Sequence, residues 1–366
     1  MNKRKFLSLF IVFSFVFTGC ATASQDTTST VVNAEISQSW QDAAGSITPE
    51  EITAEITYLA SRQLEGRRAQ TRGSALAADF IARHLEYLGL KPVYKDYFQE
   101  FAFSDLNDYH ALKKRFERAR EHGYSVPDSG KNVIAMLEGT TKKNEYIILT
   151  AHYDHMGLNP ERTTGEIKMH LGADDNASGT AALMEIAEAF DFLAEQGIRP
   201  QRSIIFLFAD AEEWGLLGSK YFAQNPPVPI ENIVAAINMD MLSRNAENTV
   251  NVIASPMVTN AAEKNPDLYA ISKQIAQYLG LQLNLPEEAA ERQVFFRSDH
   301  YSFFEASPPL DRMPVIFYSA GLHPDYHTSR DTADKINNKK VAKIAQFIFL
   351  VTLKVAQAQN APDYIE

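Results

Sequence analysis

Two kinds of apolar pattern alternate along most of the chain. Short apolar runs are typical of strands buried inside a sheet, and they occupy residues 93–103, 131–137, 146–151, 203–209, 233–240, 249–253 and 315–318. Segments with helical patterning lie between them, at residues 74–88, 178–190, 216–224, 265–278 and 337–357. The alternation predicts an α/β fold: a mostly parallel, or mixed, doubly wound sheet with helices on both faces.

The N-terminal part of the chain does not follow this pattern. Residues 1–19 predict an export signal, because a basic start precedes an apolar core at residues 6–17 that is too short for a good membrane span. Residues 20–46 are polar and rich in Ser, Thr and Gln, which favours a flexible tether. Thr48 has the right neighbours to cap a first helix. We therefore expect one domain at residues 47–360.

The predicted signal ends in Gly19-Cys20, which resembles a bacterial lipobox. In that motif the cysteine is lipidated and becomes the new N-terminus, and Cys20 is the only cysteine of the chain. The alternative is ordinary signal cleavage after Ala23. We favour an exported lipoprotein, anchored at the periplasmic face or the cell surface. If the cell is Gram-negative, Ala21 after the cysteine favours the outer membrane.

Composition narrows the chemistry. The chain has 366 residues and a formal net charge of −11, which argues against nucleic acid as a partner because phosphate backbones need faces rich in Lys and Arg. A single cysteine excludes both a disulfide framework and a cysteine-rich zinc site. Any metal must therefore be held by histidine and carboxylate side chains.

Such side chains gather where the predicted strands end. Because ligands bind beyond the carboxyl ends of parallel strands, these residues are expected at one edge of the sheet: His152, Asp154, Asp174, Asp175, Glu212, Glu213, Asp240 and His327. Two divalent metals need about five or six protein ligands around a shared water, and a further carboxylate must take the proton of that water. The adjacent pair Glu212-Glu213 can divide these two tasks. Taken alone, the pair also fits a surface turn.

The motifs together resemble zinc-dependent exopeptidases of the aminopeptidase Y and bacterial leucyl aminopeptidase type. The resemblance covers residues 51–335 and rests on His152-Tyr153-Asp154, residues 172–179, Glu212-Glu213 with the glycines after them, Asn238-Met239-Asp240 and Tyr326-His327-Thr328. It implies a zinc-exopeptidase fold of the phosphorylase/hydrolase-like type. Many exported relatives carry an inserted protease-associated domain, which we do not expect here because residues 104–130 are too few.

The resemblance also implies a ligand set for two zinc ions. His152 and Asp240 would bind one ion. Glu213 and His327 would bind the other. Asp174 would bridge the two ions.

Further roles follow from the same resemblance. A cis peptide bond is expected between Asp174 and Asp175. Glu212 would be the general base, and Asp154 would orient a metal-bound histidine through its second ring nitrogen. Tyr326 would help to stabilise the oxyanion.

Other candidate residues are expected to have structural roles. We interpret residues 64–68 as a loop without chemistry of its own, and His155 and His170 as structural or exposed. His323 would shape the loop before the last metal ligand. A serine triad at residues 298–300 is disfavoured, because three consecutive residues cannot face one another in that geometry.

The sequence thus predicts an aminopeptidase that removes N-terminal residues from peptides through a hydroxide bridging two zinc ions. The alternatives are a carboxypeptidase or dipeptidase on the same scaffold, or a glutaminyl cyclase, which expects one metal. A non-catalytic binding protein is a further alternative, but it expects lost ligands, and the ligands and the base are all present here.

Replacing Cys20 by Ser is expected to abolish lipid attachment, because the thiol is the only group in the chain that can carry the lipid at this motif. Incorporation of labelled palmitate, followed by fractionation of membranes, measures the effect. Labelling that persists in the Cys20→Ser variant would contradict the lipoprotein assignment.

Overall fold

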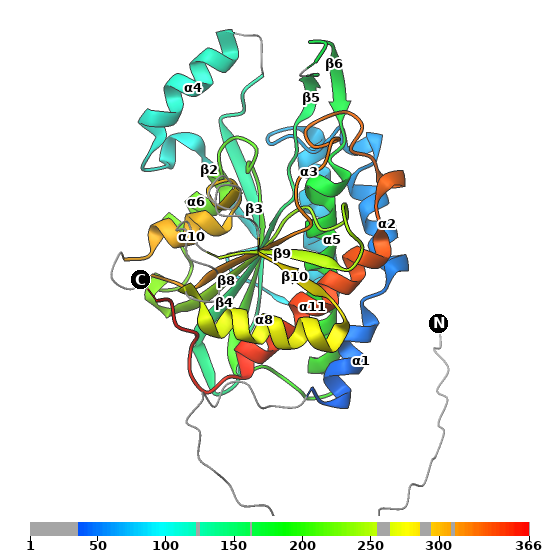
Figure 1. Cartoon of the computed structure of the whole chain (residues 1–366). Helices are drawn as coiled ribbons and strands as arrows, with labels where there is room; N and C mark the ends of the chain where they lie inside the picture. The colour runs from blue at the N-terminus through cyan, green and yellow to red at the C-terminus, as the bar shows by residue number, and fades with distance from the viewer. Residues whose placement is uncertain are drawn as a thin grey trace, which may run out of the picture. The chain divides into compact units, whose positions relative to one another are not determined.

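A mixed sheet forms the centre of the chain in the computed structural model, which describes residues 36–121, 125–161, 163–254, 264–285, 294–308 and 312–365. Within these ranges the sheet has nine strands in the order β1-β3-β7-β4-β8-β11-β9-β10, and β2 also pairs with β3 (Figure 1). The strands are β1 (Lys91–Pro92), β2 (Phe98–Ala102), β3 (Ser129–Leu137), β4 (Lys142–His152), β7 (Arg202–Ala209), β8 (Ile233–Met239), β9 (Thr249–Ile253), β10 (Gln282–Asn284) and β11 (Val315–Ser319).

The middle of this sheet is parallel. Strand β4 pairs in parallel with β7 on one side and β8 on the other, and β8 pairs in parallel with β11. Antiparallel pairs join β3 to β7 and β9 to β11. The mixed doubly wound sheet that the sequence predicts is therefore confirmed, and the ends of β4, β7 and β8 meet at one edge.

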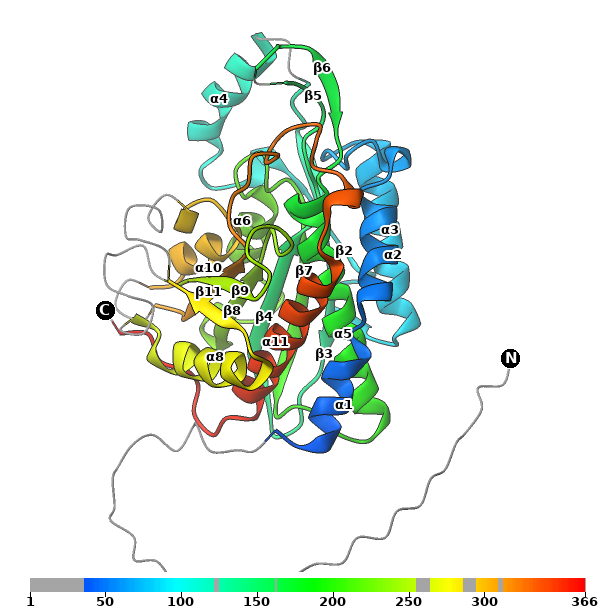
Figure 2. The same ribbon diagram turned by 45° about the vertical axis from the view of Figure 1, so that its right-hand side comes forward.

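Helices cover both faces of the sheet (Figures 1 and 2). Side chains alternate along β7: Phe206 and Phe208 pack into the apolar cluster that includes α5 and α11, whereas Leu207 packs into the cluster of α6 and α10. Burying each of these side chains stabilises the fold by about 1.5–3 kcal/mol. The helices are α1 (Gln38–Ser46), α2 (Pro49–Leu59), α3 (Arg72–Tyr87), α5 (Gly179–Glu195), α8 (Pro266–Leu279) and α11 (Asn338–Gln357) on one side, and α6 (Leu217–Gln224) and α10 (His300–Ala306) on the other.

The prediction of a flexible tether at residues 20–46 was wrong for residues 38–46. Residues 38–46 form α1, whose Ala43 and Ala44 are buried in the main apolar cluster. The segment is polar overall, so its composition does not reveal that these two small apolar residues are buried. The predicted cap at Thr48 is confirmed, since its side chain accepts a hydrogen bond from the backbone N–H of Glu51. Residues 1–35, which include the predicted signal and its cysteine, lie outside the described residues.

Two further elements stand beyond the carboxyl ends of the parallel strands (Figures 1 and 2). They are the helix α4 (Tyr109–Glu121) and the hairpin of β5 (Gly157–Pro160) and β6 (Ile167–His170). Short helical turns complete the described part: η1 (Arg62–Leu64), η2 (Phe103–Asp105), η3 (Ala173–Ser178), η4 (Ile230–Asn232) and η5 (Ala333–Lys335). No helix of the described ranges is long and apolar enough to cross a membrane.

A buried pair of acids between α2 and α5 makes the stability of the fold depend on pH. Burial, together with the charges of Glu185 and Glu188, raises the pKa of Glu55 well above its ordinary value. Burial likewise raises the pKa of Glu185 to about 8. The folded state therefore holds protons that the unfolded chain releases, and the free energy of unfolding falls as the pH rises from about 4.5 to about 8.

Replacing Glu55 by Gln is expected to stabilise the protein at pH 9 by on the order of 1–3 kcal/mol, because one buried charge is removed. At pH 4 the variant and the original protein should be nearly equal. Urea unfolding at both pH values measures the difference. The exposed Glu50 of the same helix supplies the control, since Glu50→Gln should change neither value. An equal effect of Glu55→Gln at both pH values would contradict this explanation.

Candidate metal centre and active site

The carboxylate of Asp175 lies between two groups of histidine and acidic side chains. Its Oδ1 is 3.4 Å from Nε2 of His152, and its Oδ2 is 3.1 Å from Nε2 of His327. His152 ends β4, His327 lies in the loop after β11, and Asp175 belongs to η3. One carboxylate thus reaches both histidines, as a ligand shared by two metal ions must.

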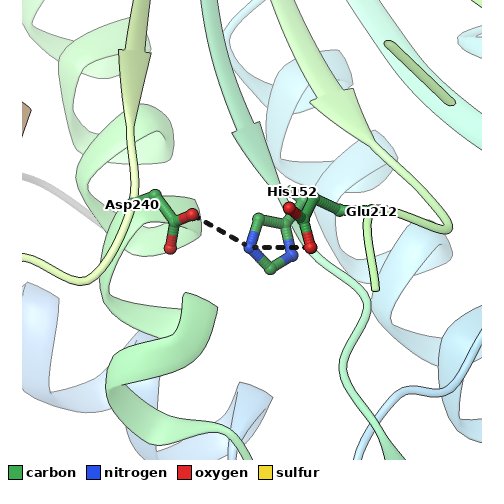
Figure 3. Close-up of side chains that lie close together, drawn as sticks. All are labelled: His152, Glu212 and Asp240. Carbon is green, nitrogen blue, oxygen red and sulfur yellow. Dashed lines mark ion pairs between the residues drawn. The ribbon is translucent and has the colours of Figure 1, made fainter. Parts of the chain in front are cut away.

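The first group consists of His152, Glu212 and Asp240 (Figure 3). Nε2 of His152 is 3.5 Å from Oδ2 of Asp240 and 4.0 Å from Oε2 of Glu212. Strand β4 lies between β7, which leads to Glu212, and β8, which leads to Asp240. Parallel pairing therefore brings together three side chains that are far apart in the sequence.

The second group consists of His155, Glu213 and His327, with Asp175 beside them. Nδ1 of His155 is 2.8 Å from Oε1 of Glu213, and Nε2 of His327 is 3.1 Å from Oε2 of the same carboxylate. The ring of His155, which is expected from the sequence to be structural or exposed, is fully buried against Glu213. Only the turn after β4 decides that this ring faces the site.

The predicted bridging residue was wrong by one position. The carboxylate of Asp174 faces away from both groups: its Oδ1 accepts a hydrogen bond from the backbone N–H of Ser243, and its Oδ2 is 3.3 Å from Nε2 of His323. The cis peptide bond joins Asp175 to Asn176, not Asp174 to Asp175. Adjacent residues in this turn point in different directions, so two consecutive aspartates cannot be told apart by spacing alone.

Buried side chains hold the backbone of this turn in place. Both carboxylate oxygens of Asp331 accept hydrogen bonds from the N–H of Asp174, and one of them also accepts from the N–H of Asp175. The guanidinium of Arg67 donates to the carbonyls of Tyr153, Leu171 and Gly172. Arg67 lies in the loop to which the sequence analysis assigned no chemistry. Its role is to fix the ends of two segments that carry site residues.

Hydrogen bonds also orient the first group. Nδ1 of His152 lies 3.2 Å from the backbone oxygen of Asp154 and 3.6 Å from its Oδ1, which leaves Nε2 directed at the acids. The same Oδ1 accepts a hydrogen bond from the backbone N–H of Glu212. Ser298 donates to Oδ2 of Asp240 and accepts from Asn238. Ser298 is thus tied to a candidate ligand, outside any serine triad.

The two neighbouring glutamates have opposite pKa shifts. Burial raises the pKa of Glu212 well above its ordinary value; the charge of His152 acts against this shift, and those of Glu213 and Asp240 add to it. For Glu213, burial also acts to raise the pKa, but His327 and His155 lower it well below the ordinary value. Pairs of titratable groups with divergent pKa values are typical of acid–base sites. Glu212 is suited to carry a proton, and Glu213 to remain an anion.

Unpaired buried atoms among these histidine and acidic side chains indicate that the site is suited to bind metal ions. Buried atoms without a hydrogen-bond partner in the described residues include Nε2 of His152, Nε2 of His155 and Oδ1 of Asp240. Leaving so many buried polar atoms unpaired is costly unless a cation satisfies them. Histidine nitrogens and carboxylate oxygens at one buried place are the ligands that divalent zinc accepts.

A cavity of about 230 Å³ opens beside the first group. Glu212, Asp240 and Tyr326 contribute to its lining, and its other walls include the apolar side chains of Ile253, Val294 and Phe317. We call this the apolar cavity. The apolar cavity is therefore a small apolar space directly beside the candidate reacting groups.

Tyr326 is positioned at this cavity by two contacts. Its ring stacks on that of His327 with centroids 3.8 Å apart, and its hydroxyl accepts a hydrogen bond of 3.0 Å from Arg297. Burial, and then the charges of Asp175 and Glu213, raise the pKa of Tyr326. The phenol therefore keeps its proton, and because Arg297 occupies the oxygen, the proton remains available for another acceptor.

A profile of peptidase family M28 matches residues 132–352, the segment that carries every side chain of both groups. The chain belongs to peptidase family M28. This confirms the resemblance to zinc-dependent exopeptidases that the motifs indicate. The structure brings His152, Glu212, Glu213, Asp240 and His327 together as that resemblance implies. Asp175 takes the position expected for Asp174, and His155 is an additional member of the site.

Individual M28 relatives differ in their activities. The chain is 38% identical over 119 residues to probable glutamate carboxypeptidase LAMP1 of Arabidopsis thaliana, which covers 32% of this chain and 16% of that protein. It is 23% identical over 266 residues to aminopeptidase YwaD of Bacillus subtilis, covering 71% and 52%. The LapA aminopeptidase structure of Legionella pneumophila matches with a TM-score of 0.64 at 18% identity, covering 93% and 79%. The chain thus spans about half or less of these two sequence relatives.

Replacing Asp175 by Asn is expected to lower the affinity for zinc by more than about 100-fold, since one substitution removes an oxygen ligand facing both groups. Replacing Asp174 by Asn should keep bound zinc and cost stability alone, on the order of 1–3 kcal/mol, because its hydrogen bonds are internal to the fold. Zinc content per chain after gel filtration, with thermal unfolding, separates the two effects. Loss of zinc from Asp174→Asn but not from Asp175→Asn would restore the original assignment.

Proposed function

We propose that this M28 protein is an aminopeptidase that uses two zinc ions to remove the N-terminal residue of peptides. The observation that carries the proposal is the carboxylate of Asp175 between two groups of buried ligands, with Glu212 at the edge of a cavity. The aminopeptidases YwaD and LapA among its relatives support the same activity. His152 and Asp240 would hold one ion, and Glu213 and His327 the other, with Asp175 shared. His155 lies close enough to Glu213 to fix its orientation.

Each reacting group has a defined task in this proposal. Two bound zinc ions supply Lewis acidity, which activates water at neutral pH and polarises the scissile carbonyl. Glu212 takes a proton from the attacking water at a carboxylate oxygen and passes it to the leaving amine. Metal ions held by the neighbouring ligands would supply positive charge that favours the ionised form of Glu212, so that its carboxylate could accept this proton. Asp154 fixes the backbone of Glu212 while it does so.

Tyr326 stabilises the oxygen of the scissile carbonyl as negative charge develops there. Its hydroxyl lines the same cavity as Glu212 and keeps its proton. Because Arg297 donates to the phenolic oxygen, the phenolic hydrogen is directed elsewhere and is a stronger donor.

The apolar cavity is the place for the side chain of the residue that is removed. Its volume of about 230 Å³ and its walls of Ile253, Val294 and Phe317 favour a medium-sized apolar side chain such as Leu or Met. Glu212 and Asp240 at its inner end favour the positive charge of a free N-terminal amine.

We also propose that the protein acts outside the cytoplasm as a lipoprotein anchored through Cys20. This rests on the sequence of residues 1–20 alone. The zinc centre does not depend on it, because all of its candidate ligands lie between residues 152 and 327.

Release of nitroaniline from a panel of aminoacyl-nitroanilides, called anilides below, tests the function. Leucyl- and methionyl-anilides are expected to be cleaved fastest, and a chelator should abolish cleavage until zinc is restored. The Glu212→Gln variant should keep its zinc and lose about 10²–10⁴-fold in kcat, the range of a general base.

The outcomes distinguish the alternatives. An active Glu212→Gln enzyme would overturn the assignment of the base. No cleavage of any anilide by the zinc-loaded protein, with two ions per chain, would point to a carboxypeptidase or a narrow dipeptidase. One ion per chain with cyclisation of N-terminal glutamine would identify a glutaminyl cyclase. No bound zinc and no activity would leave a binding protein.

A further inference from the structure

A second cavity adjoins the metal centre. It has a volume of about 300 Å³, and its lining includes Glu213 and His327 of the second group together with Trp214. The opposite wall is formed by Arg115 and Ala119 of α4, and Met156 and Asn159 complete the lining. We call this the α4 cavity. The proposed function leaves it without an occupant.

Helix α4 is held firmly enough to form a wall. Phe116 is buried in an apolar cluster, with its ring 5.9 Å from that of Phe103 and 6.2 Å from that of Trp214. Just before the helix, Asp108 forms an ion pair of 3.1 Å with Lys220 of α6. The helix is therefore fixed beside the segment that follows Glu213.

Arg115 extends from α4 toward the metal centre. A Cβ atom placed on Gly215 would lie 3.3 Å from Nη1 of Arg115, so the guanidinium reaches the backbone two residues after Glu213. Among the described residues that line the α4 cavity, Arg115 carries the only permanent positive charge.

The two cavities adjoin different residues of the metal centre: Glu212 and Tyr326 line the apolar cavity, and Glu213 and His327 line the α4 cavity. The groups that act on the carbonyl, Glu212 and Tyr326, line the apolar cavity, so the residue before the bond occupies that space. The leaving residue must then extend past Glu213 and His327, which places it in the α4 cavity. If the leaving residue ends the peptide, it carries a carboxylate. A guanidinium is the side chain best suited to bind a carboxylate.

We propose that Arg115 of α4 binds a carboxylate of the leaving residue, so that the enzyme prefers short peptides, dipeptides above all. This inference rests on the proposed aminopeptidase function and adds its substrate class. The carboxylate has two possible sources, the C-terminus of a dipeptide or an acidic side chain at the second position.

Matched substrates test the proposal with the zinc-loaded protein. Leucyl-glycine carries a terminal carboxylate, leucyl-glycinamide carries none, and leucyl-isoglutamine carries a side-chain carboxylate alone. Arg115→Ala is expected to lower kcat/KM for leucyl-glycine by about 5–10-fold, mainly through a higher KM, as is usual for one charge-assisted contact at an exposed site. Its kcat/KM for leucyl-glycinamide and for leucyl-anilide should stay within about twofold of the original value.

Two further variants sharpen the result. Lys113→Ala removes an exposed charge from the same helix and should leave all substrates unaffected, whereas Arg115→Lys should retain part of the preference. Loss of leucyl-isoglutamine cleavage in Arg115→Ala would show that a side-chain carboxylate is also bound, and its retention would assign the contact to the C-terminus.

Three outcomes would overturn the proposal. Equal losses for the acid and the amide would show that Arg115 acts on folding or catalysis in general. An equal effect of Lys113→Ala would show that the general positive charge of α4, and not a specific contact of Arg115, favours the substrate carboxylate. Normal anilide cleavage with no effect of Arg115→Ala would remove this inference alone, whereas no cleavage of any anilide or leucyl dipeptide by the original protein would remove the proposed function with it.

Discussion

The site depends on the burial of several carboxylates close together at one place. Asp175, Glu212, Glu213 and Asp240 lie at the same edge of the sheet, and the histidines between them and the buried guanidinium of Arg67 oppose only part of their repulsion. Charges of one sign in a dry environment repel strongly. The arrangement is therefore stable as a site for divalent cations, and the unpaired ligand atoms of the described structure have the same explanation.

The rest of the fold holds these acidic side chains together against their mutual repulsion. Parallel pairing of β4 with β7 and β8 fixes the strand ends, and apolar clusters on both faces make the sheet rigid. Arg67 and Asp331 then fix the loops between elements through backbone hydrogen bonds. Because both are buried and bind main-chain atoms, each restrains several site residues at once.

The surroundings of the centre differ on its two sides. An apolar cavity adjoins Glu212 and Tyr326, and a cavity with a cationic wall adjoins Glu213 and His327. The asymmetry follows from the elements that form the walls. Strands β9 and β11 contribute Ile253 and Phe317 to the apolar cavity, whereas helix α4 contributes Arg115 and Ala119 to the α4 cavity. An exposed helix can change its charges without affecting the core, which makes it the natural place for a substrate preference to vary.

The sequence by itself determined the class of fold, the edge of the sheet that carries the site, and the residue types of the site. Apolar runs and helical spacing set the strands and helices, and strands that end in His152, Glu212 or Asp240 must place them together once the sheet is parallel. Only the tertiary structure decided between Asp174 and Asp175, because the direction of each side chain depends on the turn that Asp331 holds. It alone revealed the parts of His155 and Arg67, since a buried contact between loops leaves no periodic signal. The same holds for α1, whose small buried alanines become apparent only where α5 and α11 pack against them.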